Sequence, residues 1–345
     1  MTLGVAPESE GVTSPRRNGE PLLALDDLYV EFRGRRQTVA ALNGLSYSVA
    51  AGETLAVVGE SGSGKSVSAQ AVMGILDCPP ARIRRGEIRY RGTDILRLPE
   101  RQRRKLRATK IAMVFQDALS ALNPVYTVGE QIAEMFRVHR GDSHGEARRK
   151  AIEMMERVRI PDARRRVGDY PHQFSGGMRQ RIMIAVALAL DPEVLIADEP
   201  TTALDVTVQA QIMKLLRELK DESNLALILI THDLGVVAEV ADRIAVVYAG
   251  QVVEEAPVGP LFASPAHPYT KGLIASIPRL GHRGERLPTL RGAPPTLAAP
   301  PTGCPFSPRC PYAQPVCVDN VPPLRDVLPS RRSACHFAEQ VLADA

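Results

Sequence analysis

The segment Gly59–Ser66 constrains this chain more than any other part of its sequence. It reads Gly-Glu-Ser-Gly-Ser-Gly-Lys-Ser and fits the pattern G-x-x-x-x-G-K-[ST]. An apolar run, Thr54–Val58, precedes it, and a helical stretch, Ser66–Leu76, follows it. Glycines in this setting let backbone N–H groups turn toward phosphate oxygens, and the helix N-terminus adds a favourable dipole. The sequence therefore predicts a phosphate-binding loop, which fits this context better than a merely flexible Gly/Ser turn.

The loop and the start of its helix supply a set of candidate nucleotide-binding residues. We expect Lys65 to reach the β- and γ-phosphates and the Ser66 hydroxyl to ligate Mg²⁺. The full set is Gly59, Ser61, Gly62, Ser63, Gly64, Lys65, Ser66 and Val67.

Two adjacent acids follow a second apolar run, Val194–Ala197. In phosphate-loop enzymes the first acid holds Mg²⁺, which predicts that role for Asp198. The neighbouring carboxylate, Glu199, can orient and activate the attacking water. Taken alone this pattern is weak, because turns often begin with acids. Its place after the phosphate loop makes it a candidate catalytic strand end.

Strand-like and helical segments alternate through most of the chain. Buried-strand patterns cover Thr54–Val58, Val194–Ala197 and Leu225–Ile230, and helical patterns lie between them, notably at Val206–Asn224. This alternation predicts an α/β fold with a parallel sheet covered on both faces. Helical periodicity with few strand signals predicts a helical subdomain, inserted at about residues 117–190.

Composition divides the chain further. Residues 1–20 predict a flexible leader, and residues 21–256 a globular domain. Of the 28 prolines, 17 lie in residues 257–345, a density that disfavours long helices and central strands. We therefore expect a small C-terminal extension that needs another source of order.

The apolar content allows a sizeable core but no membrane span. Hydrophobic residues make up 44% of the chain, yet none of their runs reaches the length of about 20 that a spanning helix needs. Residues 1–20 also lack the apolar stretch of a signal peptide. The net charge of +4 says little about partners. We expect a soluble or peripheral protein of the cytosol, so that in transport other chains would supply the path through the membrane.

The segment Phe174–Arg181 reads Phe-Ser-Gly-Gly-Met-Arg-Gln-Arg and precedes an apolar helix. It can be explained as an ordinary helix N-cap at Ser175. It also resembles the signature of ABC transporters, from whose usual Leu-Ser-Gly-Gly-Gln it departs at Phe174 and Met178. Both departures leave the hydroxyl of Ser175 and the backbone N–H groups of Gly176 and Gly177 in place.

Further residues that resemble ABC-transporter motifs occur in the expected order along residues 22–256. Gln116 resembles the Q-loop residue, Asp205 the D-loop residue and His232 the switch histidine. Phe32 is placed like the aromatic that stacks on adenine, with Tyr29 as its competitor. The resemblance implies an ATPase with a P-loop NTPase core, Mg²⁺ held by Ser66, Gln116 and Asp198, and catalysis by Glu199 and His232. It also implies two nucleotides sandwiched between two such domains, each γ-phosphate being capped by the partner's signature.

Four cysteines lie in the proline-rich extension. Cys304, Cys310, Cys317 and Cys335 lack the Cys-x-x-Cys spacing of a zinc ribbon. A proline-rich tail with little core still favours a metal staple, either Zn²⁺ or an iron–sulfur cluster. The alternative is four unrelated thiols.

The extension carries a second resemblance. Ala266–Thr270 reads Ala-His-Pro-Tyr-Thr and Gly303–Cys310 reads Gly-Cys-Pro-Phe-Ser-Pro-Arg-Cys. Both are similar to the C-terminal extension of oligopeptide/dipeptide importer ATPases. That family implies a [4Fe–4S] cluster on the four cysteines, with Zn²⁺ as the alternative.

The same resemblance implies peptide import and a set of partners. These are a second ATPase, in this family often a paralogue, two transmembrane permease subunits and a peptide-binding protein, at the cytoplasmic face of the inner membrane. A metal or sugar cargo and a non-transport ABC ATPase remain alternatives. The basic run Arg97–Lys110 has no aromatic residue for base stacking and predicts a solvated surface helix, so no nucleic-acid partner is expected.

Overall fold

The computed structural model describes residues 20–34, 37–202, 204–277, 290–295 and 302–344. The predicted leader lies outside them except for Glu20. The strands are β1 (Leu23–Arg33), β2 (Thr38–Val49), β3 (Thr54–Val58), β4 (Ala81–Tyr90), β5 (Thr93–Asp94), β6 (Ile111–Val114), β7 (Val194–Asp198), β8 (Ala226–Thr231), β9 (Arg243–Tyr248), β10 (Gln251–Pro257), β11 (Arg325–Leu328) and β12 (Arg331–Ser333).

Helices connect these strands. The α-helices are α1 (Lys65–Met73), α2 (Glu100–Thr109), α3 (Ala118–Ala121), α4 (Val128–Arg140), α5 (His144–Arg157), α6 (Ala163–Arg166), α7 (Gly176–Leu188), α8 (Val206–Ser223), α9 (Leu234–Val240), α10 (Val258–Ala263), α11 (Pro268–Ala275), α12 (Pro315–Asp319) and α13 (Ala338–Ala343). The 3₁₀ turns are η1 (Ile95–Arg97), η2 (Pro171–Gln173) and η3 (Ser307–Arg309). Within the described part of the chain, no helix has both the length and the apolar character to cross a membrane.

The central sheet has eight strands in the order β11-β12-β10-β9-β3-β8-β7-β6. The strands β9, β3, β8, β7 and β6 run parallel, as the alternation of strands and helices predicts. Strands β3, β7 and β8 are buried along their whole length, which explains their continuous apolar sequences. The antiparallel edge of β10, β12 and β11 was not predicted. Its two outer strands are short, in keeping with the many prolines around them.

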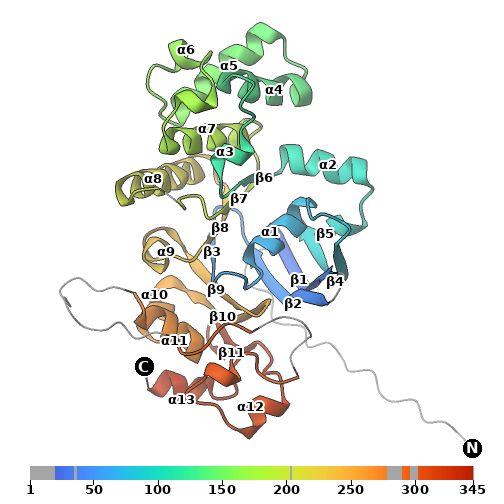
Figure 1. Ribbon diagram of the computed structural model, residues 1–345, viewed down its shortest axis with the longest axis vertical. Coiled ribbons are helices and arrows are strands. Elements are labelled where there is room, and N and C mark those ends of the chain that lie inside the picture. Colours follow the sequence, from blue (N-terminus) through green and yellow to red (C-terminus); the bar gives the residue numbers. More distant parts are fainter. Residues whose placement is uncertain (1–19, 35–36, 203, 278–289, 296–301, 345) are drawn as a thin grey trace, which may run out of the picture.

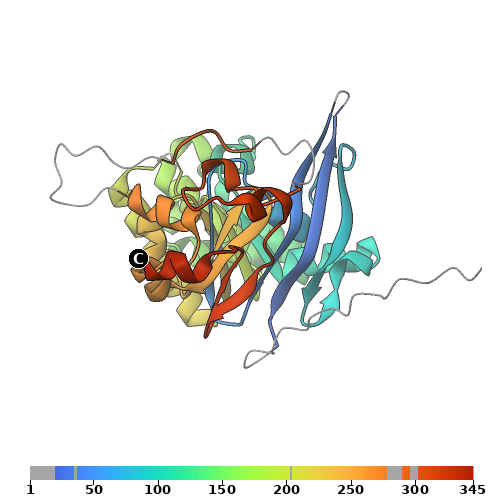
Figure 2. The same ribbon diagram turned by 90° about the horizontal axis from the view of Figure 1, so that it is seen from below.

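A second sheet, β2-β1-β4-β5, is antiparallel and lies beside the central one (Figure 2). Apolar side chains of β1, β2, β4 and α1 form one core with those of the central strands, including Leu45, Ile88, Val72 and Ile196. Helix α1 therefore begins in the interior, where this core fixes its first turn. The last two residues of the loop Gly59–Ser66, Lys65 and Ser66, are the first two of α1.

Between β6 and β7 the chain forms the helices α3 to α7, at one end of the molecule (Figure 1). The apolar faces of α4 and α5 meet those of α7 and α8 in one core, where Ile132, Phe136, Met155 and Ile182 are buried. At the other end of the view lie α10 to α13 and the strands β11 and β12. The phosphate loop lies between these two groups of helices.

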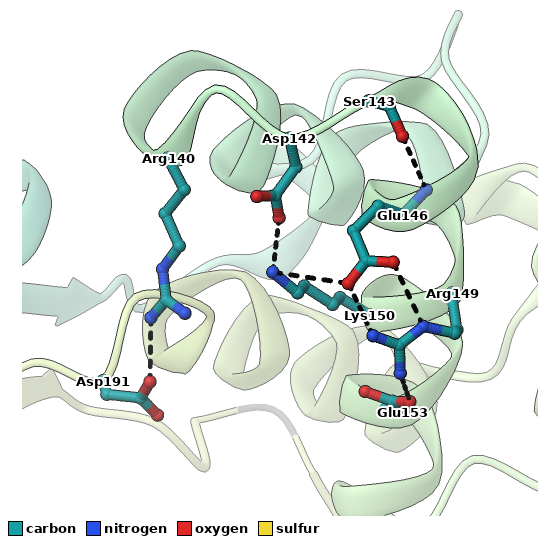
Figure 3. Close-up of polar contacts among 8 residues, drawn as sticks. All are labelled: Arg140, Asp142, Ser143, Glu146, Arg149, Lys150, Glu153 and Asp191. Atoms are coloured by element: carbon teal, nitrogen blue, oxygen red, sulfur yellow. Dashed lines mark hydrogen bonds and ion pairs between the residues drawn. The ribbon is translucent and has the colours of Figure 1, made fainter.

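Charged side chains fix the turn between α4 and α5 (Figure 3). The Ser143 hydroxyl accepts from the Glu146 N–H and caps α5. The ammonium of Lys150 lies 2.6 Å from Asp142. Arg149 pairs with Glu146 in the same group, and Figure 3 also shows the pairs of Arg149 with Glu153 and of Arg140 with Asp191. Exposed pairs of this kind stabilise little one by one, so we take the group to orient the helices and not to drive folding.

The basic run forms η1 and α2, which confirms the predicted surface helix. Leu106 packs against the core between the two sheets. Arg107 turns back and donates to the carbonyl oxygens of Met73 and Gly74, at 3.1 Å each. Arg107 is therefore engaged within the fold at the C-terminal end of α1.

The C-terminal extension docks through buried polar groups as well as the strand β12. The carboxylate of Glu254, on β10, accepts from the backbone N–H groups of Ala266 (2.7 Å) and His267 (3.0 Å). His267 caps α11, since its Nδ1 accepts from the Tyr269 N–H at 3.1 Å. His267 thus has a structural role, as its place between Ala266 and Pro268 predicts.

These two buried groups predict opposite effects of pH on stability. Burial lowers the pKa of His267 to about 3, so its contribution is present above about pH 6.5 and is lost as pH falls. Burial raises the pKa of Glu254 to about 7, so its contribution is present below about pH 4.5 and is lost as pH rises to 7. Between pH 7 and 5 the two changes offset each other.

Replacing His267 with asparagine removes the contribution of His267 to the pH dependence of stability and leaves that of Glu254. Asparagine keeps a capping oxygen for α11 but does not titrate. We compare the free energy of unfolding at pH 5 with that at pH 7 in each protein. In His267→Asn this difference should be about 2 kcal/mol more favourable to the folded state than in the wild type. Urea denaturation followed by circular dichroism measures this difference. The exposed His139→Asn variant serves as the control, and equal pH dependence in all three proteins would contradict the prediction.

Candidate active site

The loop Gly59–Ser66 joins the buried strand β3 to α1, as predicted. Gly64 has φ +104°, and a side chain there would meet the carbonyl oxygen of Ala41 at 2.7 Å. Only glycine fits a position that is both left-handed and this close to a neighbouring backbone. The turn Ser61–Gly62 is exposed, whereas Ser63 and Lys65 are buried. Val67, in the first turn of α1, packs against the core between the two sheets.

Two side chains inside the loop are arranged to meet an anion. The ammonium of Lys65 donates to the carbonyl oxygens of Gly59 (2.8 Å) and Glu60 (2.9 Å). The buried hydroxyl of Ser63 has no hydrogen-bond partner among the described residues. Since buried polar groups normally find a partner, an open hydroxyl beside a lysine fits a loop that receives phosphate oxygens.

Ser66 meets the end of β7 across the sheet. Its hydroxyl donates to Oδ1 of Asp198 at 3.0 Å. Burial raises the pKa of Asp198, the hydrogen bond from Ser66 opposes this, and the charge of Glu199 adds to the rise. A hydroxyl paired with a buried carboxylate is a ligand set that suits Mg²⁺, which takes one or two carboxylates together with phosphate and water oxygens.

Glu199 lies at the centre of a polar group that also contains Gln116, Thr202 and His232. Its Oε2 accepts from Gln116 Nε2 and from the Thr202 hydroxyl, at 2.9 Å each. Its Oε1 lies 3.2 Å from Nδ1 of His232. The backbone of Glu199 has φ +45°, a strained conformation for a residue other than glycine. Strain of this kind persists where the surroundings fix a side chain for function.

Electrostatics keep Glu199 charged. Burial raises its pKa, but the hydrogen bonds from Thr202 and His232 and the nearby charges of His232 and Lys65 together lower it more, so that the net shift is downward. The carboxylate is therefore ionised at neutral pH. Burial lowers the pKa of Lys65, and the carboxylates of Glu199, Asp198 and Glu60 oppose that shift.

Two of the predicted site residues, Ser175 and Asp205, cap helices with their side chains. Ser175 caps α7, where its hydroxyl accepts from the Met178 N–H at 3.4 Å. Gly176 and Gly177 lie close to Leu204 and Val208, at the start of α8. Asp205 caps α8 in the same way, accepting from the Val208 N–H at 3.0 Å. In the described part of the chain, no hydrogen bond or ion pair joins the Ser175–Gly177 segment or Asp205 to the phosphate loop.

The two candidate adenine-binding aromatics lie on β1. Tyr29 pairs with Asn43 of β2, and Phe32 pairs with Val39. The guanidinium of Arg85 covers the ring of Tyr29, 4.4 Å from its centre. Phe32 is half-buried at the edge of the core.

Thr202 is a site residue that the sequence alone did not reveal. It follows Glu199 in a turn where its N–H donates to the Glu199 carbonyl oxygen at 3.2 Å. The signal available was the spacing of a hydroxyl three residues after a carboxylate, which is typical of such turns.

The fold and this group of side chains define an ATP-binding cassette ATPase. A family model described as ABC transporter matches residues 42–202. A second, described as Oligopeptide/dipeptide transporter, C-terminal region, matches residues 253–317. The oligopeptide transport ATP-binding protein OppD of Salmonella typhimurium is 50% identical over 327 residues, 95% of this chain and 97% of OppD. The chain therefore belongs to the ATP-binding proteins of the oligopeptide/dipeptide ABC transporter family, which confirms both resemblances.

Solved structures share the fold. The ATP-binding cassette MJ0796, a dimer in a post-hydrolysis state bound to ADP and Pi, is 30% identical, with a TM-score of 0.61 over 68% of this chain and 98% of MJ0796. CbiO1 of Clostridium perfringens, part of the ABC transporter complex CbiONQ, is 29% identical, with a TM-score of 0.61 over 71% of this chain and 92% of CbiO1. These similarities confirm the predicted P-loop NTPase fold.

The predicted [4Fe–4S] cluster is wrong. No three or more His, Cys, Asp or Glu side chains of the described residues are grouped so that they could hold a metal ion, which leaves the Zn²⁺ alternative without a site as well. The name of the relative OppD and the ABC transporter match describe ordinary transport ATPases. The thiols at issue are Cys304, Cys310, Cys317 and Cys335.

Packing explains what these thiols do instead. Cys304 and Cys310 pack against the apolar cluster around Phe306, and Cys335 packs with Ala338 and Val341. Burial raises the pKa of Cys310 to about 11 and that of Cys335 to about 12, so both keep their protons at neutral pH. Protonated buried cysteines behave as small apolar side chains.

Proposed function

We propose that this protein hydrolyses ATP to power the import of peptides through a membrane ABC transporter. The observation that carries the proposal is the meeting of Lys65, Ser66, Asp198 and Glu199 at the carboxyl ends of the parallel strands β3 and β7, which flank β8. Ligands of open α/β sheets bind at such an edge. The membership in the oligopeptide/dipeptide transporter family supports the cargo class.

The phosphate loop would hold the nucleotide. Lys65 would bind the β- and γ-phosphates, and the open hydroxyl of Ser63 and the N–H groups at the start of α1 would receive further oxygens. Mg²⁺, held by Ser66, Asp198 and Gln116, would neutralise charge that develops on the phosphates. We assign Gly59, Ser61, Gly62, Gly64 and Val67 to the shape of the loop.

Glu199 would orient and activate the attacking water. Its carboxylate is ionised, and three neighbours fix its direction, which suits a general base. His232 is largely exposed and in contact with Glu199, so it can reach the γ-phosphate and stabilise its charge. Thr202 would position the same carboxylate through its hydroxyl.

A second ATPase subunit would complete each site. The Ser175–Gly177 segment begins α7 with an exposed serine and the N–H groups of a helix N-terminus, which favour an anion. Because no hydrogen bond or ion pair joins this segment to its own chain's phosphate loop in the described part of the chain, we assign it to the γ-phosphate held by the partner. Asp205, exposed at the start of α8, would lie in the same interface.

We assign adenine stacking to Phe32. The ring of the competitor Tyr29 is already covered by Arg85, which leaves one face fewer for a base. Phe32 is half-buried at the edge of the sheet, and no cation lies over its ring among the described residues.

The chain would divide into two domains and bind several other subunits. Residues 21–256 would form the nucleotide-binding domain, with a helical subdomain at about 117–190, and residues 257–345 the extension. Phe115, Val125 and Tyr126 are exposed apolar side chains around the start of that subdomain, which suits docking of a permease loop. Two permease subunits, a paralogous ATPase and a peptide-binding protein would then place the chain on the cytoplasmic face of the inner membrane.

Reconstituted transport tests the proposed function. The complex is purified from its host through this chain, the co-purifying chains are identified, and uptake of labelled peptides into vesicles is measured with ATP. We expect ATP-dependent peptide uptake that stops when this subunit is left out. A complex that takes up a metal ion or a sugar but no peptide would overturn the cargo assignment, while leaving the ATPase assignment in place.

A further inference from the structure

The C-terminal extension reaches the phosphate loop through a single arginine. Arg309, in η3, donates from Nη1 to Glu60 Oε2 at 2.7 Å and from Nη2 to Glu60 Oε1 at 2.9 Å. Glu60 is the second residue of the loop, 249 positions earlier in the chain. The side chain of Arg309 is 5% exposed and that of Glu60 25%, so this two-pronged ion pair is shielded from water.

The remaining donors of Arg309 are also used within the fold. Its Nε donates to the carbonyl oxygen of Arg291 at 2.9 Å, and Nη1 lies 3.3 Å from the Tyr248 hydroxyl. The rings of Tyr248, Tyr269 and Phe306 pack together beside it, with centres 4.6 to 5.5 Å apart. The arginine is thus held in place by β9 and by the extension before it meets the loop.

Glu60 is joined to the nucleotide-binding lysine by its backbone. The Glu60 carbonyl oxygen accepts from Lys65 Nζ at 2.9 Å, while its N–H donates to the Tyr269 hydroxyl at 2.8 Å. The charge of Glu60 also acts on the Lys65 ammonium. A carboxylate at this position would repel a polyphosphate in the loop unless a cation neutralised it.

We propose that Arg309 is a positioning residue for ATP, which neutralises and holds Glu60 so that the phosphate loop accepts the nucleotide. This inference rests on the proposed function, because it assumes that the loop binds ATP. The extension would then do more than pack against the nucleotide-binding domain, because its guanidinium neutralises the charge of Glu60 in the loop. Loss of Arg309 should therefore weaken ATP binding through Glu60 and leave the chemical step intact.

Replacement of Arg309 by methionine tests this directly, because methionine keeps an apolar stem beside Tyr248 and Phe306. We expect the Kd and KM for ATP to rise about tenfold, within the usual range of coupling between sites, with kcat at saturation within about twofold of the wild type. The double variant Arg309→Met/Glu60→Gln should recover most of the lost affinity, because it removes the unpaired carboxylate. A purely structural role predicts no such recovery.

A matched control lies in the same extension. Arg325 forms a two-pronged pair with Glu339, at 2.6 and 2.8 Å, on an exposed surface, and Arg325→Met should leave ATP affinity unchanged. If Arg309→Met does not fold, the Kd for ATP of Glu60→Gln tests the inference instead. We expect this variant to bind ATP at least as tightly as the wild type. Wild-type affinity in Arg309→Met, or a tenfold loss in Glu60→Gln, would overturn the inference. Failure of the wild type to bind ATP would instead count against the proposed function.

Discussion

Replacing Glu199 with glutamine is expected to lower kcat for ATP hydrolysis by about 10²–10⁴-fold, while ATP still binds. That range is the usual contribution of a positioned general base. An amide cannot take a proton from water, but it has almost the same shape as the carboxylate. The structure accommodates it: an amide oxygen can accept from Gln116 and Thr202, and the amide nitrogen can donate to Nδ1 of His232. The fold and the loop should therefore stay intact.

Phosphate release at saturating ATP measures the turnover of Glu199→Gln, and calorimetric titration with ATP measures its affinity. Glu239→Gln, an exposed change on α9, serves as the control and should behave as the wild type. Turnover at the wild-type rate in Glu199→Gln would show that another group activates the water. Loss of ATP binding would show that Glu199 supports the loop and not the chemistry.

Much of the site could be predicted from the sequence because its parts are local. A phosphate loop needs its glycines and lysine within a few residues, and the acids Asp198 and Glu199 lie next to each other at the end of the apolar strand β7. A parallel sheet then brings distant strand ends to one edge, so β3, β7 and β8 place Lys65, Asp198 and His232 together. The sequence predicts each strand, and the geometry of parallel sheets predicts that they meet.

What could not be predicted depends on contacts between distant segments. The pair of Glu60 and Arg309 has no local pattern, because each residue is an ordinary charged side chain in its own segment. The antiparallel edge of the central sheet arises in the same way, since β12 joins β10 only after the extension has folded back.

The prediction of a metal cluster on the four cysteines was wrong for a related reason. Clustering along the chain does not fix how thiols lie in space, and neighbours such as Phe306 decide whether they pack or ligate. A resemblance of two sequence motifs to oligopeptide/dipeptide importer ATPases carried the cluster into the prediction. Among the described residues, however, no three His, Cys, Asp or Glu side chains are grouped so that they could hold a metal ion. Motifs whose chemistry needs several distant residues are therefore less secure than the phosphate loop.

Replacing Lys65 with alanine is expected to raise the Kd for ATP by about 10- to 100-fold. A hydrogen bond to a charged group contributes about 1.5–3 kcal/mol, and each 1.4 kcal/mol is a factor of ten in affinity. The ammonium is buried against the carbonyl oxygens of Gly59 and Glu60. Lys65 is the sole Lys or Arg in the sequence of Gly59–Ser66, so no other cation of the loop can replace it at the phosphates. Calorimetric titration with ATP and Mg²⁺ measures the change.

The loss in Lys65→Ala must be separated from a collapse of the loop. Lys214→Ala removes an exposed lysine of α8 and controls for net charge, and melting temperatures without nucleotide report on the fold. We expect Lys65→Ala to melt close to the wild type, because Ser68 and Tyr47 still anchor α1 through a hydrogen bond of 3.0 Å. ATP should then stabilise the wild type and Lys214→Ala but not Lys65→Ala, since only binding to the native state raises the melting temperature. Equal stabilisation of all three proteins would remove Lys65 from the nucleotide site.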